Sequence, residues 1–152
     1  MSQFYRNLTG MGNLMHGLSK NFIIFFTLLI FFSGCLASEK SETISIPEGH
    51  MYSFSFNMPE DSEVQFELET NRKAVDLLVL DEENYKIYEK AFTGGKGATF
   101  KSLESHPGVI STSISFTSYK NGIYYIVIEN ADVLKDGVSP AGDVIAQVSY
   151  RT

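Results

Sequence analysis

The chain has 152 residues with 18 acidic and 12 basic side chains, which gives a formal net charge of −6 at pH 7. This length predicts a single domain. The acidity argues against nucleic acid as a partner, because phosphate binding depends on Lys and Arg. The single cysteine excludes an intramolecular disulfide.

An apolar run from Phe22 to Phe32, interrupted only by Thr27, lies between Lys20 and the single cysteine, Cys35. A helix that crosses a bilayer needs about 20 apolar residues, so this run is short for a membrane span. It fits the apolar core of a signal peptide, which is about 7–15 residues long and follows a positive residue. We therefore expect residues 1–34 to form a helical signal peptide.

The residues at the end of this leader, Phe32-Ser33-Gly34-Cys35, resemble the lipobox of prokaryotic lipoproteins. The resemblance implies cleavage between Gly34 and Cys35 and a diacylglyceryl group on Cys35, and Phe32 at its position implies an archaeal source. Two acyl chains anchor a protein stably, whereas one binds only marginally. The alternatives are an uncleaved signal anchor with an inert Cys35 and plain secretion.

Met15 would begin a leader of ordinary length, so the true start of translation is expected there, with Met11 as another candidate. Loss of the leader removes only Arg6 and Lys20 from the charged residues, which leaves ten basic against 18 acidic side chains and a charge of −8. Anionic lipid headgroups would repel such a domain. The lipid is therefore expected to hold the protein on the extracytoplasmic face of the cell membrane, with residues 35–42 as a tether.

From Thr43 onward the hydrophobic pattern has a period of two, which is typical of half-buried antiparallel strands. Val64–Glu69 alternates most clearly, whereas Ala74–Leu80 is apolar on both faces except at Asp76, which predicts a central strand. The predicted strands are 43–46, 52–56, 64–69, 74–80, 85–88, 98–103, 110–117, 123–128 and 144–150. They predict an all-β fold over residues 43–152, a single antiparallel β-sandwich of eight to nine strands with jelly-roll-like wiring and no helix.

Turn residues separate these strands. Ser105–Gly108 is expected to break the chain, and 98–103 is expected to be a weak edge strand. Lys120-Asn121-Gly122 is the strongest hairpin signal, because Asn-Gly readily adopts the positive φ of a tight turn.

The stretch Val75–Asp81 with Asn84-Tyr85, followed by Gly122–Asn130, resembles the sheets of a GOLD-type (Golgi dynamics) or pre-peptidase C-terminal β-sandwich. The resemblance covers about residues 43–150 and rests on core residues and turns. It implies a non-enzymatic domain that binds protein or carbohydrate or packs beside a larger domain. It supplies no catalytic motif.

The loop 130–143 is the best candidate for a metal site, because Asn130, Asp132, Asp136 and Asp143 offer the hard oxygen ligands that Ca²⁺ prefers. Their spacing differs from the EF-hand loop, and Asp, Gly and Pro are also ordinary turn residues. A calcium-dependent carbohydrate-binding module is therefore the alternative to a metal-free binding module for a protein or glycan.

Tyrosines are abundant, and Tyr85, Tyr88 and Tyr119 are the candidates for an exposed platform that binds a ligand. His50 and His106 both lie in predicted turns, and a zinc site or a Ser-His-Asp triad built on them is the enzymatic alternative. No catalytic signature accompanies them, and we expect no enzyme activity.

Overall fold

The computed structural model describes residues 38–94, 99–134 and 137–152. These residues form eight strands and one helix: β1 Lys40–Ile46, β2 His50–Met58, β3 Glu63–Thr70, β4 Val75–Asp81, α2 Glu82–Phe92, β5 Glu104–Val109, β6 Ser111–Thr117, β7 Gly122–Asn130 and β8 Val144–Arg151. The predicted all-β sandwich is confirmed. The predicted leader, the cleavage site and Cys35 lie outside the described residues.

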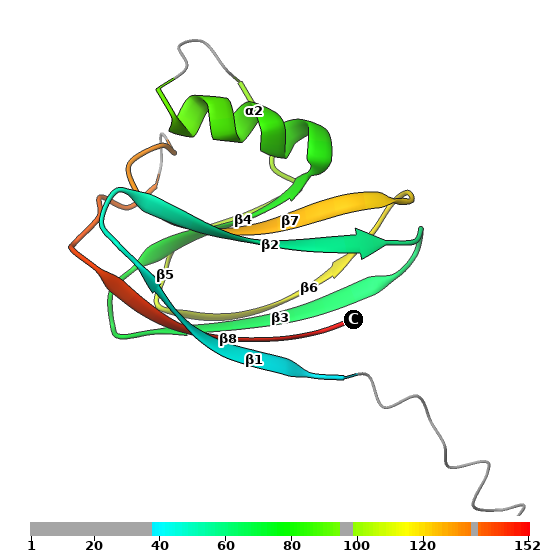
Figure 1. The fold of residues 1–152 in the computed structure, drawn as a ribbon, viewed down its shortest axis with the longest axis horizontal. Coiled ribbons are helices and arrows are strands. Elements are labelled where there is room, and N and C mark those ends of the chain that lie inside the picture. The colour runs from blue at the N-terminus through cyan, green and yellow to red at the C-terminus, as the bar shows by residue number, and fades with distance from the viewer. Residues whose placement is uncertain (1–37, 95–98, 135–136) are drawn as a thin grey trace, which may run out of the picture. The chain divides into compact units, whose positions relative to one another are not determined.

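Two antiparallel sheets of four strands each make up the sandwich, with strand orders β1-β8-β3-β6 and β2-β7-β4-β5 (Figure 1). Within the described residues, every connection passes from one sheet to the other except β4-α2-β5, which stays in one sheet. This order is that of an eight-stranded jelly roll. The jelly-roll-like wiring that the strand spacing predicted is therefore present.

Alternation of apolar and polar residues explains why these segments form a two-layer fold. In β3, Val64, Phe66 and Leu68 are buried between the sheets while Glu67 and Glu69 face solvent. Equivalent residues from seven of the strands, all but β5, complete a single core between the layers. Burial of such side chains stabilises the fold by about 1.5–3 kcal/mol for each large apolar residue.

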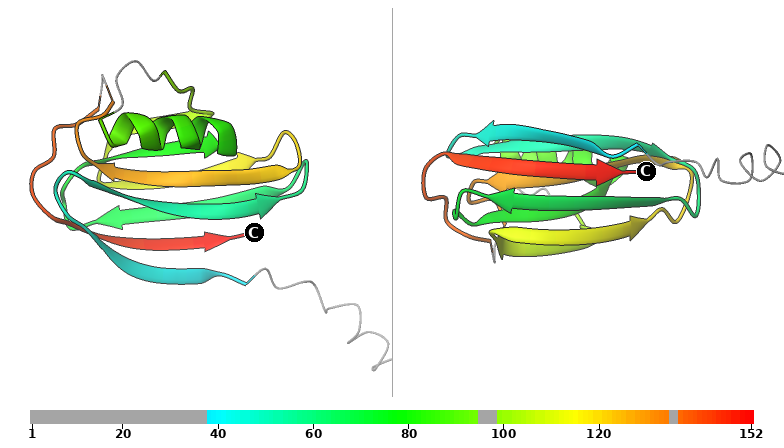
Figure 2. Two further views of the ribbon diagram at one scale, coloured as in Figure 1. Left: turned by 45° about the horizontal axis from the view of Figure 1, so that its top comes forward. Right: turned by 90° about the horizontal axis from the view of Figure 1, so that it is seen from below.

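A second, smaller core lies on the outer side of the sheet β2-β7-β4-β5. β4 is buried on both faces, as its continuous apolar run predicted: one side faces the other sheet and the other faces helix α2 (Figure 2). Buried residues of this second core are Leu78, Leu80, Tyr85, Tyr88 and Val127. Helix α2 thus adds a third layer over this sheet.

The prediction of a strand at residues 85–88 is wrong, because these residues belong to α2. Asp81 caps the helix by accepting a hydrogen bond from the Asn84 backbone N–H, and Glu82 and Glu83 lie in its first turn, where acids favour a helix start. Tyr85 and Tyr88 lie one turn apart and face the sheet. The alternation over only four residues fitted both a strand and this helical spacing.

The chain is also not broken at 105–108, where β5 forms instead. The expected edge strand at 98–103 is not present in its described part, 99–103. β5 is nevertheless an edge strand, and its register against β4 shifts between Val75 and Leu77. Pro107 and Gly108, whose φ is 70°, lie at this irregularity. A bulged edge with proline is a common protection against pairing with another chain.

Lys120-Asn121-Gly122 does not form the predicted hairpin, because β6 and β7 belong to different sheets. The segment crosses the end of the sandwich, and Asn121 Oδ1 accepts a 2.8 Å hydrogen bond from the Glu60 N–H of the neighbouring crossing. Asn-Gly is therefore used for a contact between turns. β1 begins at Lys40, so it includes residues 40–42, which the sequence predicted to be part of the tether, 35–42.

Candidate functional site

One sheet face lacks a covering layer in the described part of the chain. Helix α2 lies over the sheet β2-β7-β4-β5, whereas no helix crosses the outer face of the sheet β1-β8-β3-β6 (Figures 1 and 2). The outer face of β1-β8-β3-β6 is called the open face below.

The open face is a lattice of hydroxyl, amide and carboxylate groups set by the strand register. Ser41 on β1 pairs with Ser149 on β8, which pairs with Glu67 on β3, which pairs with Ser113 on β6. The next row, two residues along each strand, places Thr43, Gln147, Glu69 and Ser111 side by side. Residues from four strands, separated widely in sequence, therefore meet on one surface.

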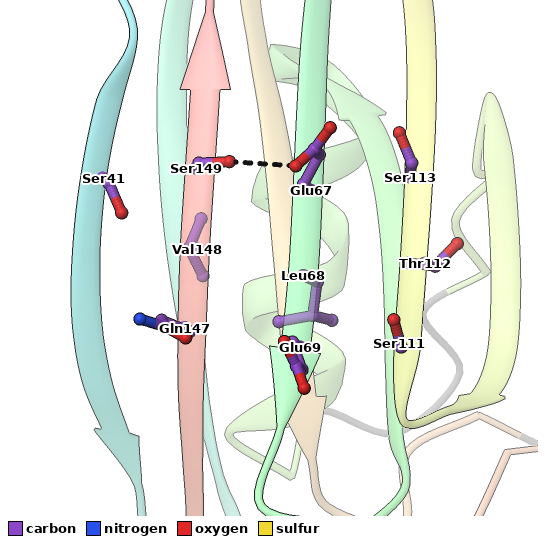
Figure 3. A pocket seen from close by; sticks show the side chains of 10 residues that line it. All are labelled: Ser41, Glu67, Leu68, Glu69, Ser111, Thr112, Ser113, Gln147, Val148 and Ser149. Atoms are coloured by element: carbon purple, nitrogen blue, oxygen red, sulfur yellow. Dashed lines mark hydrogen bonds between the residues drawn. The ribbon is translucent and has the colours of Figure 1, made fainter.

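A groove of about 320 Å³ runs over this lattice. Its lining residues are Ser41, Glu67, Leu68, Glu69, Ser111, Thr112, Ser113, Gln147, Val148 and Ser149 (Figure 3). Ser149 Oγ donates a 3.3 Å hydrogen bond to Glu67 Oε2, which holds the carboxylate toward the centre of the groove. Glu69 lies one pleat further along β3, about 6.8 Å away.

This groove has the chemistry of a binding surface. None of its lining residues is a histidine, cysteine, lysine or arginine. The lining has no imidazole to take the proton of a serine hydroxyl, and its only bases are the carboxylates of Glu67 and Glu69. The groove instead offers hydroxyl donors, one amide and two carboxylate acceptors in a fixed pattern.

The strip beside the groove is also polar. Arg151 Nε donates a 2.8 Å hydrogen bond to Gln65 Oε1, and Ser115 donates one to Glu63. The Ser115 and Gln65 hydrogen bonds hold the pKa of Glu63 below its ordinary value. On this face β3 therefore carries the exposed acids Glu63, Glu67 and Glu69, with the Arg151 guanidinium beside Gln65.

The predicted tyrosine platform does not exist as an exposed surface. Both Tyr85 and Tyr88 lie on the side of α2 that faces the sheet, where Tyr88 is fully buried and Tyr85 is 92% buried. The Tyr85 ring stacks on Tyr125, with ring centroids 3.8 Å apart. Tyr119 is half exposed at the end of the sandwich, and its hydroxyl donates to Asp81 Oδ2 over 2.7 Å. Two of the three tyrosines are therefore core residues.

A buried polar cluster that the sequence did not single out lies under α2. Glu129 on β7 is fully buried, and it accepts hydrogen bonds from the Tyr88 hydroxyl (2.8 Å) and the Val133 N–H (2.9 Å). Burial raises the pKa of Glu129, and the neighbouring Asp76 carboxylate adds to the effect. Burial, followed by the charge of Glu129, also raises the pKa of Tyr88.

Asp76 is the cross-strand neighbour of Glu129 and is equally buried. It accepts hydrogen bonds from the Gly108 N–H in β5 (2.8 Å) and from the Val138 N–H in the loop between β7 and β8 (3.1 Å). Gly137 lies so close that a side chain there would collide with this carboxylate. The two carboxylates therefore hold loops against the sheet by hydrogen bonds. The sequence signal that could have indicated this cluster is a single charged residue within an apolar strand.

Of the predicted calcium ligands, Asp136 lies outside the described residues. Asp132 is exposed, and Asp143 Oδ1 accepts a 3.2 Å hydrogen bond from the Glu48 N–H. Lys73 Nζ donates to the Asp143 carbonyl over 2.9 Å, so this backbone oxygen already has a hydrogen-bond partner. The described residues contain no group of three acids or histidines suited to a metal, and calcium binding stays a prediction.

The two histidines do not share a site. His50 begins β2 and His106 lies in β5, and these strands form the opposite edges of their sheet. His106 contacts only the Glu104 carboxylate among ionisable groups of the described chain, at 3.3 Å.

No helix in the described residues is long and apolar enough to span a membrane.

No protein-family model matches the chain, and no curated protein does. Solved structures with a similar fold do match. A mitogen from Yersinia pseudotuberculosis matches with a TM-score of 0.50 and 9% identity over 77% of this chain and 87% of its own. Two others have lower TM-scores.

The first of these, a periplasmic inhibitor of g-type lysozyme from Aeromonas hydrophila, has a TM-score of 0.48 and 8% identity over 76% of this chain and 87% of its own. The second is the pre-peptidase C-terminal domain of a Bacillus anthracis collagenase. It has a TM-score of 0.47 and 13% identity over 76% of this chain and 90% of its own. The pre-peptidase C-terminal domain is one of the two domain types that the sequence of this chain resembles. At 9% identity, the match to the mitogen shows a shared fold alone.

Proposed function

We propose that this protein is a non-enzymatic, lipid-anchored binding module on the extracytoplasmic face of the membrane, and that its open face binds a glycan. The groove of about 320 Å³ over β1, β8, β3 and β6 carries this proposal. The leader and Cys35 in the sequence support the anchor. The β-sandwich fold is compatible with an accessory module.

The position of β1 supports an oriented attachment. Lys40 begins β1 five residues after Cys35, and an extended chain of that length spans at most about 17 Å. Lys40 pairs with Tyr150 near the end of β8, so the start of β1 and the end of β8 lie at the same end of the sandwich. A lipid on Cys35 would hold this end near the bilayer and leave the open face accessible along its side.

Glycan recognition fits the groove because sugars present many hydroxyl groups in a regular array. The carboxylates of Glu67 and Glu69 can each accept two sugar hydroxyls, and the serine hydroxyls of β6 and β8 can donate or accept. A protein interface would favour aromatic residues, Met and Arg at this place and is depleted in Glu and Ser. The lining therefore favours a polyhydroxylated ligand.

The test is isothermal titration of the full-length protein in detergent with neutral oligosaccharides, namely cello-, xylo- and N-acetylated chito-oligosaccharides. The expected result is binding of at least one series, weakened at least tenfold by Glu67→Ala with Glu69→Ala, since hydrogen bonds to charged groups contribute about 1.5–3 kcal/mol each. Glu83→Ala, an exposed acid on α2, is the matched control and should leave binding unchanged. Absence of binding by every series would refute the glycan part of the proposal.

A further inference from the structure

Strand β6 has one edge that no other strand of the described chain covers. It pairs with β3 on one side and ends the sheet β1-β8-β3-β6 on the other. In the right-hand view of Figure 2, β6 runs along the border of this sheet. An unpaired strand edge is a template to which another strand can add through backbone hydrogen bonds.

The strand register identifies the backbone groups that lie at this edge. The Thr70 N–H donates to the Ile110 carbonyl and the Ser118 N–H donates to the Ser62 carbonyl, both over 2.9 Å. Because the direction of the backbone groups alternates along an antiparallel strand, the even-numbered residues of β6 face β3 and the odd-numbered ones face away from it. The outward groups have no hydrogen-bond partner within the described residues, and they belong to Ser111, Ser113, Ser115 and Thr117.

The other three sheet edges have features that discourage pairing with another strand. β5 contains Pro107 and a shift in register, and β1 carries the charged residues Lys40 and Glu42. At the edge formed by β2, Lys86 and Lys90 of α2 line a hollow beside the strand. β6 has the sequence Ser-Thr-Ser-Ile-Ser-Phe-Thr and a regular register, so it lacks charge, proline and bulge alike.

The residues of β6 are complementary to a second copy of the same strand. An antiparallel pair with its two-fold axis at Ile114 aligns all seven residues and would form about eight backbone hydrogen bonds, two for each pair of outward residues. On the inner side of the sheet it places Phe116 opposite Thr112. On the open face it places hydroxyl residues opposite each other, a favourable cross-strand arrangement, and the pairs are Ser113 with Ser115 and Ser111 with Thr117.

Charge also favours β6 as a contact between two acidic copies. The nearest acids on the open face, Glu63, Glu67 and Glu69, lie on β3, one strand further in. Three strand spacings of about 4.8 Å would separate the two β3 strands by about 14 Å, which exceeds the Debye length of about 8 Å at physiological ionic strength. Repulsion between the copies is therefore weak at this edge.

From these observations we infer that β6 pairs with β6 of a second copy and joins the two open sheets into one sheet of eight strands. Such a contact uses the same residues on both copies and closes as a dimer. The two open faces become one face that carries both grooves.

This pairing rests neither on the proposed anchor nor on glycan binding. Its two-fold axis is perpendicular to the joined sheet, so the two starts of β1 lie at diagonally opposite corners. If both copies carry the proposed lipid, a single bilayer holds them with the joined sheet lying along the membrane.

The first test is disulfide cross-linking of the full-length protein in detergent. In Ser113→Cys with Ser115→Cys, the two cysteines of one copy face those of the other, and copper-catalysed oxidation should link them into a covalent dimer. Gln147→Cys with Ser149→Cys has the same spacing on the same face of β8, a central strand, and is the matched control. The β6 variant should give at least tenfold more covalent dimer, and the unchanged protein reports any link through Cys35.

The second test is sedimentation equilibrium in density-matched detergent at micromolar to millimolar concentrations. Ser115→Pro removes an outward N–H without removing a hydrogen bond to β3, and it should raise the Kd of the dimer at least tenfold. Ser45→Pro is the matched control on β1. Ser45 pairs with Ile145, whose carbonyl accepts from the Asn71 N–H on its other side, so the Ser45 N–H also points out of the sheet. This control should leave the Kd unchanged.

Three results would overturn the inference: a monomer at every concentration, equal cross-linking of the β6 variant and the β8 control, or an equal Kd for Ser115→Pro and Ser45→Pro. Melting temperatures report whether each proline variant is folded, and the cysteine variants give an independent reading should Ser115→Pro unfold. Neutral oligosaccharides should still bind Ser115→Pro, because Ser115 is not among the residues that line the groove. A failure of strand pairing is therefore distinguishable from a failure of glycan binding.

Discussion

Tyr88→Phe tests whether the buried Glu129 carboxylate fastens helix α2 to the sheet. The substitution removes one oxygen and keeps the ring that packs against the second core. It takes away the only side-chain donor to Glu129 in the described chain, a hydroxyl at 2.8 Å. Glu129 Oε2 would then be buried without that hydrogen bond.

The expected cost follows from the burial of both groups. A buried acceptor left without its donor costs about 1–3 kcal/mol, and more when it is charged. Unfolding entropy of about 2.1 cal/mol/K per residue over the roughly 115 residues from Ser38 to Thr152 gives about 0.24 kcal/mol/K, or about 4 °C in Tm per kcal/mol. Tyr88→Phe should therefore lower Tm by about 4–12 °C.

Tyr85→Phe is the matched control, because it removes the same oxygen from the same helix. The Tyr85 hydroxyl contacts a neutral group, Ser53 Oγ, at 3.0 Å, and a hydrogen bond between neutral groups contributes about 0.5–1.5 kcal/mol. The expected loss in Tm is about 2–6 °C. Thermal unfolding followed by circular dichroism at pH 7 measures both, and a loss for Tyr88→Phe no greater than for Tyr85→Phe would refute the role of the carboxylate.

Three further predictions concern the charge on Glu129, the anchor and the metal. Because the native pKa of Glu129 is raised, the native state holds more protons than the unfolded state between the ordinary and the raised pKa, so stability falls as pH rises through that window. Glu129→Gln should not show this fall in Tm, and above the window it should be more stable relative to the unchanged protein than it is below the window. If the pH profile of Tm is the same in Glu129→Gln, Glu129 is not the titrating group. Metabolic labelling with a lipid should mark the unchanged protein and leave Cys35→Ala unmarked; equal labelling would end the anchor proposal. Calcium bound in the 130–143 loop should raise Tm in millimolar CaCl₂ and lose that effect in Asp143→Asn, whereas an unchanged Tm would argue against the metal.

The sequence predicts the sandwich well where burial alone decides the structure. Alternation in Val64–Glu69 placed β3 with one face in solvent, and the continuous apolar run before Asp81 placed β4 at the centre of its sheet. Both predictions use a single physical rule, the burial of apolar side chains. The strand register then follows from which face is buried.

The sequence does not predict the groove, because its chemistry exists only after the strands pair. Ser41, Glu67, Ser113 and Ser149 come from four strands, and each is an ordinary outward-facing residue of its own strand. No spacing along the chain brings them together. A site built across strands requires the strand order, which sequence patterns leave undetermined.

Helix α2, by contrast, was not predicted, although the rule that located the strands, the burial of apolar side chains, could also have indicated it. β4 and most of β7 are buried on both faces, so the sheet that holds them needs a layer on its outer side. β3 and β6 expose polar residues on one face and need no such layer. The segment between β4 and β5 is long enough to supply the cover, and its tyrosines at 85 and 88 have helical spacing. Patterns of burial on one or both faces therefore indicate which sheet is covered and, by the same reasoning, which face is left open for a partner.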